Sequence, residues 1–157
     1  MTKNPNIRPA VAEDIPVLKR IIEATDMFPP DMLEPMIAGF LNGTADREHW
    51  KVSGLSGPDA VAFYRPEEMT AGCWNLLLLA VDPAHQGQGI GAAMLEHVEQ
   101  HLSEMGERLL LVETSGTAAF ASTRRFYRKC GYVNEARIRD YYDNGDDKVV
   151  FRKRLDQ

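Results

Sequence analysis

The sequence predicts a single α/β domain in which helices pack on a mixed β-sheet. Apolar residues recur at strand and helix spacing in the order β-α-α-β-β-β-α-β-α-β-β. Hairpins near both ends require antiparallel strands, whereas the strand-helix-strand run between them requires a parallel pair. The length of 157 residues suits one sizeable core, so we expect one domain over residues 1–157.

The N-terminal half is predicted to hold an extended start, two helices and a hairpin. The first helix places Leu18, Ile21 and Ile22 on one face. Asn42-Gly43 is a typical stop for the second helix. The expected ranges are 7–10, 12–24, 31–41, 50–53 and 60–65.

The C-terminal half is predicted to hold the parallel crossover and a last hairpin. Gly131 suits the end of its final helix, and Asp143-Asn144-Gly145-Asp146 is a strong hairpin turn. The expected ranges are strand 73–81, helix 89–105, strand 108–114, a helix ending at 129 or 130, and strands 133–139 and 148–154.

Composition excludes several classes of function. A formal net charge of −5 provides no basic surface for nucleic acid. The sequence has neither an apolar run near the roughly 20 residues of a membrane span nor an apolar signal core at its N-terminus. Cys73 and Cys130 form no CxxC motif and are expected to be reduced thiols. We therefore expect a cytoplasmic protein with no membrane, nucleic-acid or metal partner.

The segment Gln86-Gly87-Gln88-Gly89-Ile90-Gly91 lies between a predicted strand and a predicted helix. Three glycines in five residues are costly in backbone entropy, so they require a reason. The first amides of a helix are unpaired and carry the positive end of its dipole, and glycine lets a phosphate approach them closely. The segment therefore indicates a pyrophosphate site, although a tight turn alone would also use glycine.

Two other phosphate motifs fit less well. The nucleotide signature GxxxxGK(S/T) is absent. Gly87–Ala92 does match the dinucleotide pattern GxGxxA, and Glu113 ends the next strand as a ribose-binding acid would. However, five residues separate the strand from the first glycine, and too little chain follows to complete that parallel sheet.

A family resemblance accounts for the segment better. Gln86-x-x-Gly89-x-Gly91 resembles the acyl-CoA motif Q/R-x-x-G-x-G/A of the GNAT superfamily of N-acetyltransferases. The stretch from Phe126 to Tyr132 resembles the FYxKxGF signature of that family, and the element order agrees over essentially the whole chain. The resemblance implies a GNAT-like, mostly antiparallel sheet of six to seven strands, with a central splayed parallel pair and about four flanking helices.

The resemblance also implies acetyl-CoA as cosubstrate. Backbone groups of one strand end would pair with the pantetheine arm, and the amides of the glycine segment would hold the pyrophosphate. The residues concerned are Leu79, Ala80 and Val81 for pantetheine, and Gln86, Gly87, Gln88, Gly89, Ile90, Gly91 and Ala92 for pyrophosphate.

Acetyl transfer requires a neutral amine and a protonated leaving sulfur. An alkylammonium has a pKa of about 10.4 and a thiol of about 8.5, so the nucleophile loses a proton and the thiolate gains one. The resemblance assigns the acid to Tyr127, which is otherwise an aromatic residue packed between helix and sheet, a task that Phe126 can perform. Glu113, at the end of an apolar strand, is a candidate base, or it could bond the loop at residues 115–117.

Three further acidic or basic residues are weaker candidates. His85 has a suitable intrinsic pKa but precedes the glycine segment and is expected to be exposed. Glu67 and Glu68 could line an acceptor pocket, although charges in loops are commonly solvated.

One position departs from the family. Many members carry Asn seven residues before the tyrosine, where this chain has Phe120. Thr117, Ser122 or Thr123 could replace that polar group, and Arg125, with Arg124 and Arg128, could meet a CoA phosphate or simply form a solvated helix face. We assign Ser122 and Arg125 to CoA binding.

The sequence therefore predicts an N-acetyltransferase that acts in a ternary complex, with a small amine, an amino acid or a peptide N-terminus as acceptor. The alternative is a non-catalytic module that binds or senses acyl-CoA. A homodimer is common in the resembled family.

Overall fold

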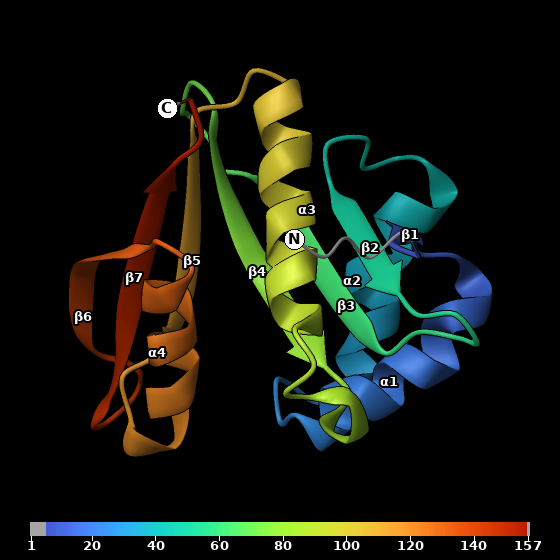
Figure 1. The fold of residues 1–157 in the computed structure, drawn as a ribbon, viewed down its shortest axis with the longest axis horizontal. Coiled ribbons are helices and arrows are strands. Elements are labelled where there is room, and N and C mark those ends of the chain that lie inside the picture. Colours follow the sequence, from blue (N-terminus) through green and yellow to red (C-terminus); the bar gives the residue numbers. More distant parts are fainter. Residues whose placement is uncertain (1–5, 157) are drawn as a thin grey trace. The chain divides into compact units, whose positions relative to one another are not determined.

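The computed structural model describes residues 6–156. Seven strands form one sheet in the order β1-β2-β3-β4-β5-β7-β6 (Figure 1). The strands are β1 (Arg8–Pro9), β2 (His49–Ser53), β3 (Ala60–Pro66), β4 (Cys73–Val81), β5 (Leu109–Ser115), β6 (Val133–Asp143) and β7 (Asp146–Arg154). The helices are α1 (Ile15–Ala24), α2 (Leu33–Asn42), α3 (Ile90–Glu104) and α4 (Ala121–Lys129).

The mixed sheet confirms the predicted fold class. β4 and β5 pair in parallel, from Cys73 opposite Leu109 to Leu76 opposite Val112. The pairs β1–β2, β2–β3, β5–β7 and β6–β7 are antiparallel. The splaying expected beyond the parallel pair stays a prediction.

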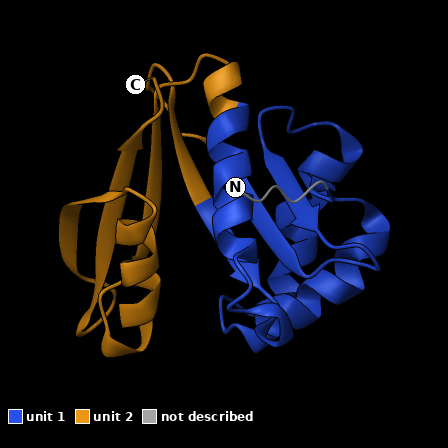
Figure 2. Cartoon of the chain, in the orientation of Figure 1, with its two compact units in different colours: residues 1–65, 77–101 blue, residues 66–76, 102–157 orange. Residues whose placement is uncertain are grey.

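The chain divides into two compact units (Figure 2). One contains residues 1–65 and 77–101, and the other contains residues 66–76 and 102–157. β4 and α3 each contribute residues to both units. The single domain expected over residues 1–157 stays a prediction.

The first unit has an apolar core between its helices and its strands. Trp50 and Phe63 stack in adjacent strands, with ring centroids 4.2 Å apart. Full burial of one such aliphatic or aromatic side chain stabilises a fold by about 1.5–3 kcal/mol. The other members of this core are Ala10, Leu18, Ile21, Ile22, Leu33, Ile37, Val52, Val61, Leu78 and Ala80.

The second unit is organised around β5 and β7, which pair from Leu109 opposite Arg154 to Ser115 opposite Lys148. α4 packs on β7 through Tyr127, whose ring centroid lies 5.9 Å from that of Phe151. β6 continues four residues beyond its expected end at 139, because Asp143 still pairs with Asp146 across the predicted hairpin turn. A register shift between Ile138 and Asp143 accommodates the extra length.

Two helices begin later than the sequence predicts. The segment Ala12–Asp14 forms a 3₁₀ turn before α1, and Pro30–Met32 forms one before α2. Pro16, which can donate no hydrogen bond, lies in the first turn of α1. A further 3₁₀ turn, Pro83–His85, lies in the segment between the predicted strand 73–81 and the predicted helix 89–105, where no regular element was expected.

Candidate functional site

The connection from β4 to α3 in the first unit is held by side-chain hydrogen bonds. The carboxylate of Asp82 accepts a bond from the amide of Ala84 (3.1 Å) and so caps the 3₁₀ turn. The side-chain amide of Gln86 donates to the carbonyl of Val81 (3.0 Å). This side chain therefore ties the loop to the end of β4.

Two of the three glycines in this loop have a left-handed backbone. Gly87 has φ 78° and Gly89 has φ 82°, a region that side chains with a Cβ rarely adopt. A Cβ added at either position would meet no atom within 4 Å. The glycines are thus required by backbone conformation, and the space beside them is open. Gly91 lies within α3 and is not among the residues of positive φ.

Gly89 immediately precedes the first residue of α3. Its carbonyl accepts the first helical hydrogen bond, from the amide of Ala93 (3.0 Å). The amides of Ile90, Gly91 and Ala92 precede that bond and have no partner in the turn before them. They carry the positive end of a helix of 15 residues, which suits an anion.

The side chains at the end of β4 alternate between buried and half-buried positions. Ala80 is buried in the core of the first unit, whereas Leu79 and Val81 are half-buried. The carbonyl of Val81 already accepts the bond from Gln86. Pairing of the backbone at Leu79, Ala80 and Val81 with pantetheine stays a prediction.

Tyr127, the predicted acid, belongs to an aromatic cluster in the second unit. Its ring centroid lies 5.1 Å from Phe126 and 5.7 Å from Tyr132. Tyr127 is buried and Phe126 is half-buried, so Tyr127 itself packs between helix and sheet, the role for which the sequence also offered Phe126. Burial raises the pKa of Tyr127, with a smaller contribution from Cys130. The phenol is therefore protonated at neutral pH, as a general acid must be.

Glu113, the predicted base, makes contacts that the sequence did not reveal. Its Oε1 lies 3.0 Å from the Lys148 ammonium, and its Oε2 accepts a hydrogen bond from the side-chain amide of Asn75 (3.2 Å). Burial opposes the charge of Lys148, but the hydrogen bond and the charge of Glu113 outweigh it and raise the pKa of Lys148. The alternative role, a bond from Glu113 to the 115–117 loop, is not among the contacts that the structure gives Glu113; Ser115 of that loop donates to Asp146 (2.5 Å).

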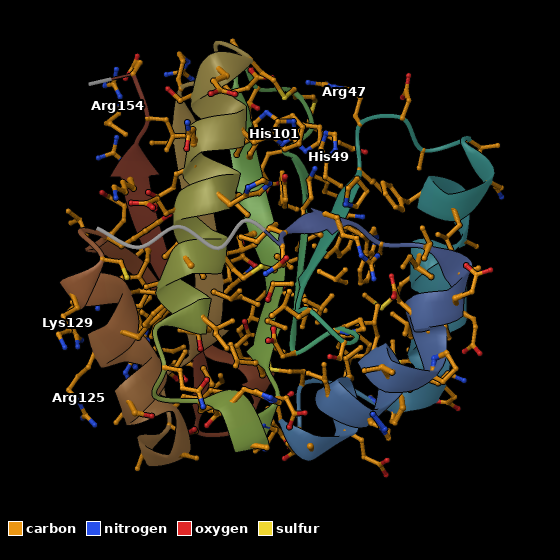
Figure 3. The ribbon with its side chains drawn as sticks, turned by 45° about the vertical axis from the view of Figure 1, so that its right-hand side comes forward. Arg47, His49, His101, Arg125, Lys129 and Arg154 are labelled. Carbon is orange, nitrogen blue, oxygen red and sulfur yellow. The ribbon has the colours of Figure 1, made fainter. Side chains whose placement is uncertain are left out.

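The polar residues of α4 that the sequence offered for CoA binding divide into two groups. Arg124 donates to the carbonyls of Ser115 (2.8 Å) and Thr117 (2.7 Å), so its guanidinium holds the loop before the helix. Ser122 and Arg125 are exposed, and Figure 3 shows Arg125 projecting outward from α4. Their exposure is compatible with binding a phosphate.

The remaining candidates differ in their surroundings. His85 has a side chain that is 45% exposed, as expected, and its Nδ1 lies 3.7 Å from Asp82. Glu68 is exposed, whereas Glu67 is half-buried and accepts a hydrogen bond from Asn75 (2.7 Å). Neither Asn75 nor Lys148 was identified from the sequence, although one polar residue within the apolar strand CWNLLLLAV was a signal for Asn75.

Residues 6–156 hold neither a metal-binding cluster nor a membrane-spanning helix. In that part of the chain no cluster of three or more metal-ligating side chains occurs. Within the same residues no helix is long and apolar enough to cross a membrane. Cys73 is a buried thiol and Cys130 a half-buried one.

The comparison with protein families identifies the class to which the chain belongs. The acetyltransferase (GNAT) domain matches residues 45–134, more than half of the chain. The chain therefore belongs to the GNAT acetyltransferase family, which confirms the resemblance found in its sequence.

Curated relatives match over a shorter length. The ribosomal protein bS18 alanine N-acetyltransferase of Escherichia coli is 39% identical over 80 residues, which are 48% of this chain and 52% of the relative. An N-acetyltransferase of Methanocaldococcus jannaschii is 30% identical over 89 residues, or 55% and 54% of the two chains. The chain thus spans about half the length of the curated relatives that it matches.

Solved structures are similar over nearly the whole fold. A GNAT-family protein from Desulfovibrio desulfuricans superposes with a TM-score of 0.88 at 32% identity, covering 95% of this chain and 98% of the other. The Escherichia coli S18 alanine N-acetyltransferase reaches 0.77 at 22% identity (96% and 94% covered). A Salmonella typhimurium protein solved with acetyl-CoA reaches 0.74 at 18% identity (96% and 94% covered). The last two show the fold alone.

Proposed function

We propose that this protein transfers the acetyl group of acetyl-CoA to a primary amine, directly and within a ternary complex. The observation that carries the proposal is the loop before α3, in a chain of the GNAT family. Gly87 and Gly89 hold that loop in a left-handed backbone and leave open space at the first amides of the helix. The positive end of the helix suits a pyrophosphate by charge, and the open space beside the glycines leaves the backbone accessible to it.

The binding of acetyl-CoA uses mostly main-chain groups. The amides from Gln86 to Ala92 hold the pyrophosphate, and the backbone at Leu79–Val81 pairs with the pantetheine arm. Ser122 and Arg125 add polar contacts to phosphate from the exposed side of α4. Because main-chain amides bind the anion, substitutions that keep the backbone will be tolerated in this loop.

The chemistry uses one acid and one base. The amine nitrogen, once neutral, attacks the thioester carbonyl; the C–S bond breaks and CoA leaves as a thiolate. Tyr127 protonates that sulfur, since its phenol is protonated at neutral pH. Glu113 accepts the proton of the amine directly or through water, and Lys148 balances the charge of its carboxylate.

The acceptor class that we favour is the α-amine of a protein N-terminus. Relatives matched by the chain are named as N-acetyltransferases of an alanine in ribosomal protein bS18, and an alanine residue offers only an α-amine. An α-amine has a pKa of about 7.7–8.0, so it loses its proton far more readily than a lysine side chain. A larger fraction of the α-amine is therefore already neutral at pH 7, and the reaction depends less on the base.

A second candidate function is acyl-CoA binding without catalysis. Two observations favour it: Tyr127 is packed among aromatic rings, and the Glu113 carboxylate is in an ion pair. A protein with these contacts could keep the CoA site and have no turnover.

Both candidate functions require that the protein binds acetyl-CoA. Calorimetric titration with acetyl-CoA, with NADH as a parallel control, tests this binding. Micromolar binding of acetyl-CoA and no binding of NADH is expected. Release of CoA thiol in the presence of alanyl peptides then separates the two candidates, since only an enzyme releases it. Binding of NADH alone would exclude both.

A further inference from the structure

The first unit contains a cavity of about 540 Å³ that the proposed mechanism does not use. Its walls come from α1, from the turn between β2 and β3 (residues 54–59), and from the loop between β4 and α3. All of its lining residues belong to the first unit, drawn in blue in Figure 2. Pockets that bind small molecules commonly have volumes of about 300–1,000 Å³, so this cavity can hold a compact metabolite.

Both signs of charge line the cavity without neutralising each other. The guanidinium of Arg20 is exposed and, among residues 6–156, takes part in no ion pair or hydrogen bond. The carboxylates of Asp59 and Asp82 line the same space, and within the described residues neither forms an ion pair with Arg20. A cation and two anions that share a cavity but do not pair leave both signs available to a ligand.

Each of the two carboxylates keeps one oxygen for a ligand. Oδ1 of Asp59 accepts a hydrogen bond from the hydroxyl of Ser53 (2.5 Å). Oδ1 of Asp82 accepts one from the amide of Ala84 (3.1 Å), whereas its Oδ2 lies 3.7 Å from Nδ1 of His85, beyond hydrogen-bond distance. The side chain of Asp82 is 34% exposed and Asp59 is half-buried, so an ammonium can reach both.

Part of the cavity wall is apolar. Val17 of α1 and Ile90 of α3 are half-buried, and Leu55 of the turn is 87% exposed. A ligand that covers these side chains removes apolar surface from water, which favours binding. A small hydrated ion would gain nothing from them, so the wall favours a ligand with an apolar group.

A ligand that uses all three features carries a carboxylate, an ammonium and an apolar group on one small body. A zwitterionic α-amino acid with an aliphatic side chain has this combination. We propose that the cavity binds such an amino acid, with its carboxylate on Arg20 and its ammonium on Asp59 and Asp82. A simple anion would be repelled by the two carboxylates, and a simple amine would leave the guanidinium unused.

The cavity is joined to the loop that is proposed to bind CoA. The amide of Asp82 donates to the carbonyl of Asp59 (2.8 Å), and the carbonyl of Asp82 accepts from the amide of His85 (2.8 Å). Ile90 lines the cavity, and its amide is one of the first amides of α3. An amino acid bound to Asp82 holds the turn that leads into the loop, so it should strengthen CoA binding. This coupling rests on the proposed function.

The test is an NMR titration of the full chain with L-leucine, observing the backbone amides of Gly54, Gly57 and Ile90. The matched probes are L-leucinamide, which lacks the carboxylate, and N-acetyl-L-leucine, which lacks the ammonium. L-Leucine should shift these amides saturably. Each of the other two should bind about tenfold or more weakly, since each loses a charge-assisted hydrogen bond.

A substitution identifies the group that binds the carboxylate. Arg20→Gln should weaken L-leucine by about tenfold or more and leave the weak binding of L-leucinamide unchanged, because only L-leucine carries a carboxylate. Arg65→Gln is the same substitution on β3, at an exposed residue outside the cavity, and should change neither affinity.

Calorimetry with CoA, which has no acetyl group and so permits no transfer, tests the coupling. Saturating L-leucine should raise the affinity for CoA by about fivefold. An unchanged CoA affinity would reject the coupling. L-Leucine binding in a protein that binds no CoA would reject the transferase and keep the cavity site, and CoA binding without a response at residues 54–59 would do the reverse.

Three further results would overturn the amino-acid site. The first is equal affinity for the three probes, and the second is an equal loss of L-leucine affinity in Arg20→Gln and Arg65→Gln. The third is a set of shifts confined to residues around Glu113 and Tyr127, since L-leucine would then bind as an acceptor at the proposed active site.

Discussion

The side-chain amide of Gln86 donates a hydrogen bond to the carbonyl of Val81, the last residue of β4. The first residue of the family motif thus closes the loop onto the strand that precedes it. Its side chain fixes where the amides of the next residues lie, so Gln86 acts on the anion site through the position of the backbone.

Replacing Gln86 with Ala should lower acetyl-CoA affinity by about fivefold, since one hydrogen bond contributes about 1 kcal/mol. The matched control is Gln88→Ala, which keeps its backbone amide and whose exposed side chain makes no comparable bond. Calorimetry of both variants measures the difference. Equal losses in the two would show that the bond to Val81 has no part in binding.

Gly89→Glu should abolish measurable acetyl-CoA binding, because it puts a carboxylate where the phosphate lies and strains a backbone of φ 82°. Gly106→Glu is its control: that glycine, after the other end of α3, has the same φ of 82° and the same open space. Both variants should lose about 1–2 kcal/mol of stability in urea unfolding. Only Gly89→Glu should lose measurable binding of acetyl-CoA.

Tyr127→Phe should reduce acetyl transfer about a hundredfold and leave acetyl-CoA affinity nearly unchanged, since a positioned acid contributes at least that factor. Tyr132→Phe removes a hydroxyl from the same aromatic cluster and controls for packing. Steady-state rates with a peptide acceptor, together with calorimetry, give both quantities. Full turnover in Tyr127→Phe would remove this residue from the mechanism.

The loop and the elements around it were predictable because their signals are local. An apolar run interrupted only by Asn75 predicted the observed bounds of β4, residues 73–81. Glycines before an amphipathic run indicated the connection between strand and helix, where the structure has a left-handed backbone at Gly87 and Gly89. Neither inference needs to know which strands are neighbours.

The surroundings of Glu113 were not predictable, because they depend on register between distant segments. Glu113 lies opposite Val150 and Ser115 opposite Lys148, so Lys148 is the diagonal neighbour of Glu113 on one face. A shift of one residue in that pairing would turn Lys148 to the other face and break the ion pair. Sequence alone fixes no register between β5 and β7.

We predict that Asp14 stabilises the folded protein and that this contribution to the free energy of unfolding is lost at low pH. Arg8 binds it through two bonds of 2.9 Å, and the amide of Val11 donates a third of 2.9 Å. The hydrogen bond from Arg8 is the main reason that the pKa of Asp14 is lowered, against the effect of burial. The contribution is complete above the unfolded pKa of about 3.9 and is lost as pH falls through the folded value.

Asp14→Asn should therefore lower the free energy of unfolding by about 1–2 kcal/mol at pH 7. The difference in this free energy between variant and wild type should become smaller as the pH falls below about 3.9. Glu13→Gln, at the exposed neighbouring position, should have the same free energy of unfolding as wild type both at pH 7 and below about pH 3.9. Urea unfolding at several pH values measures this. A gap that stays constant into acid would mean that packing, and not charge, makes Asp14 stabilising.

His49 should make the fold less stable in mild acid. Its ring lies 4.8 Å from that of His101 (Figure 3). Nδ1 of His101 in turn is hydrogen-bonded to the hydroxyl of Tyr64 (2.7 Å). Burial, then the charges of His101 and Lys51, lower the pKa of His49 to about 4. Between about pH 6.5 and that value the unfolded chain binds a proton that the folded protein does not, so stability falls as pH falls.

His49→Gln removes this proton uptake, so its unfolding free energy should decline less than that of wild type between pH 7.5 and pH 5. Because the ring is half-exposed, solvent and salt screen its charge and reduce the size of the difference. Urea unfolding of both proteins at the two pH values measures it. Equal declines would show that other groups titrate in this range and that His49 is already solvated in the folded protein.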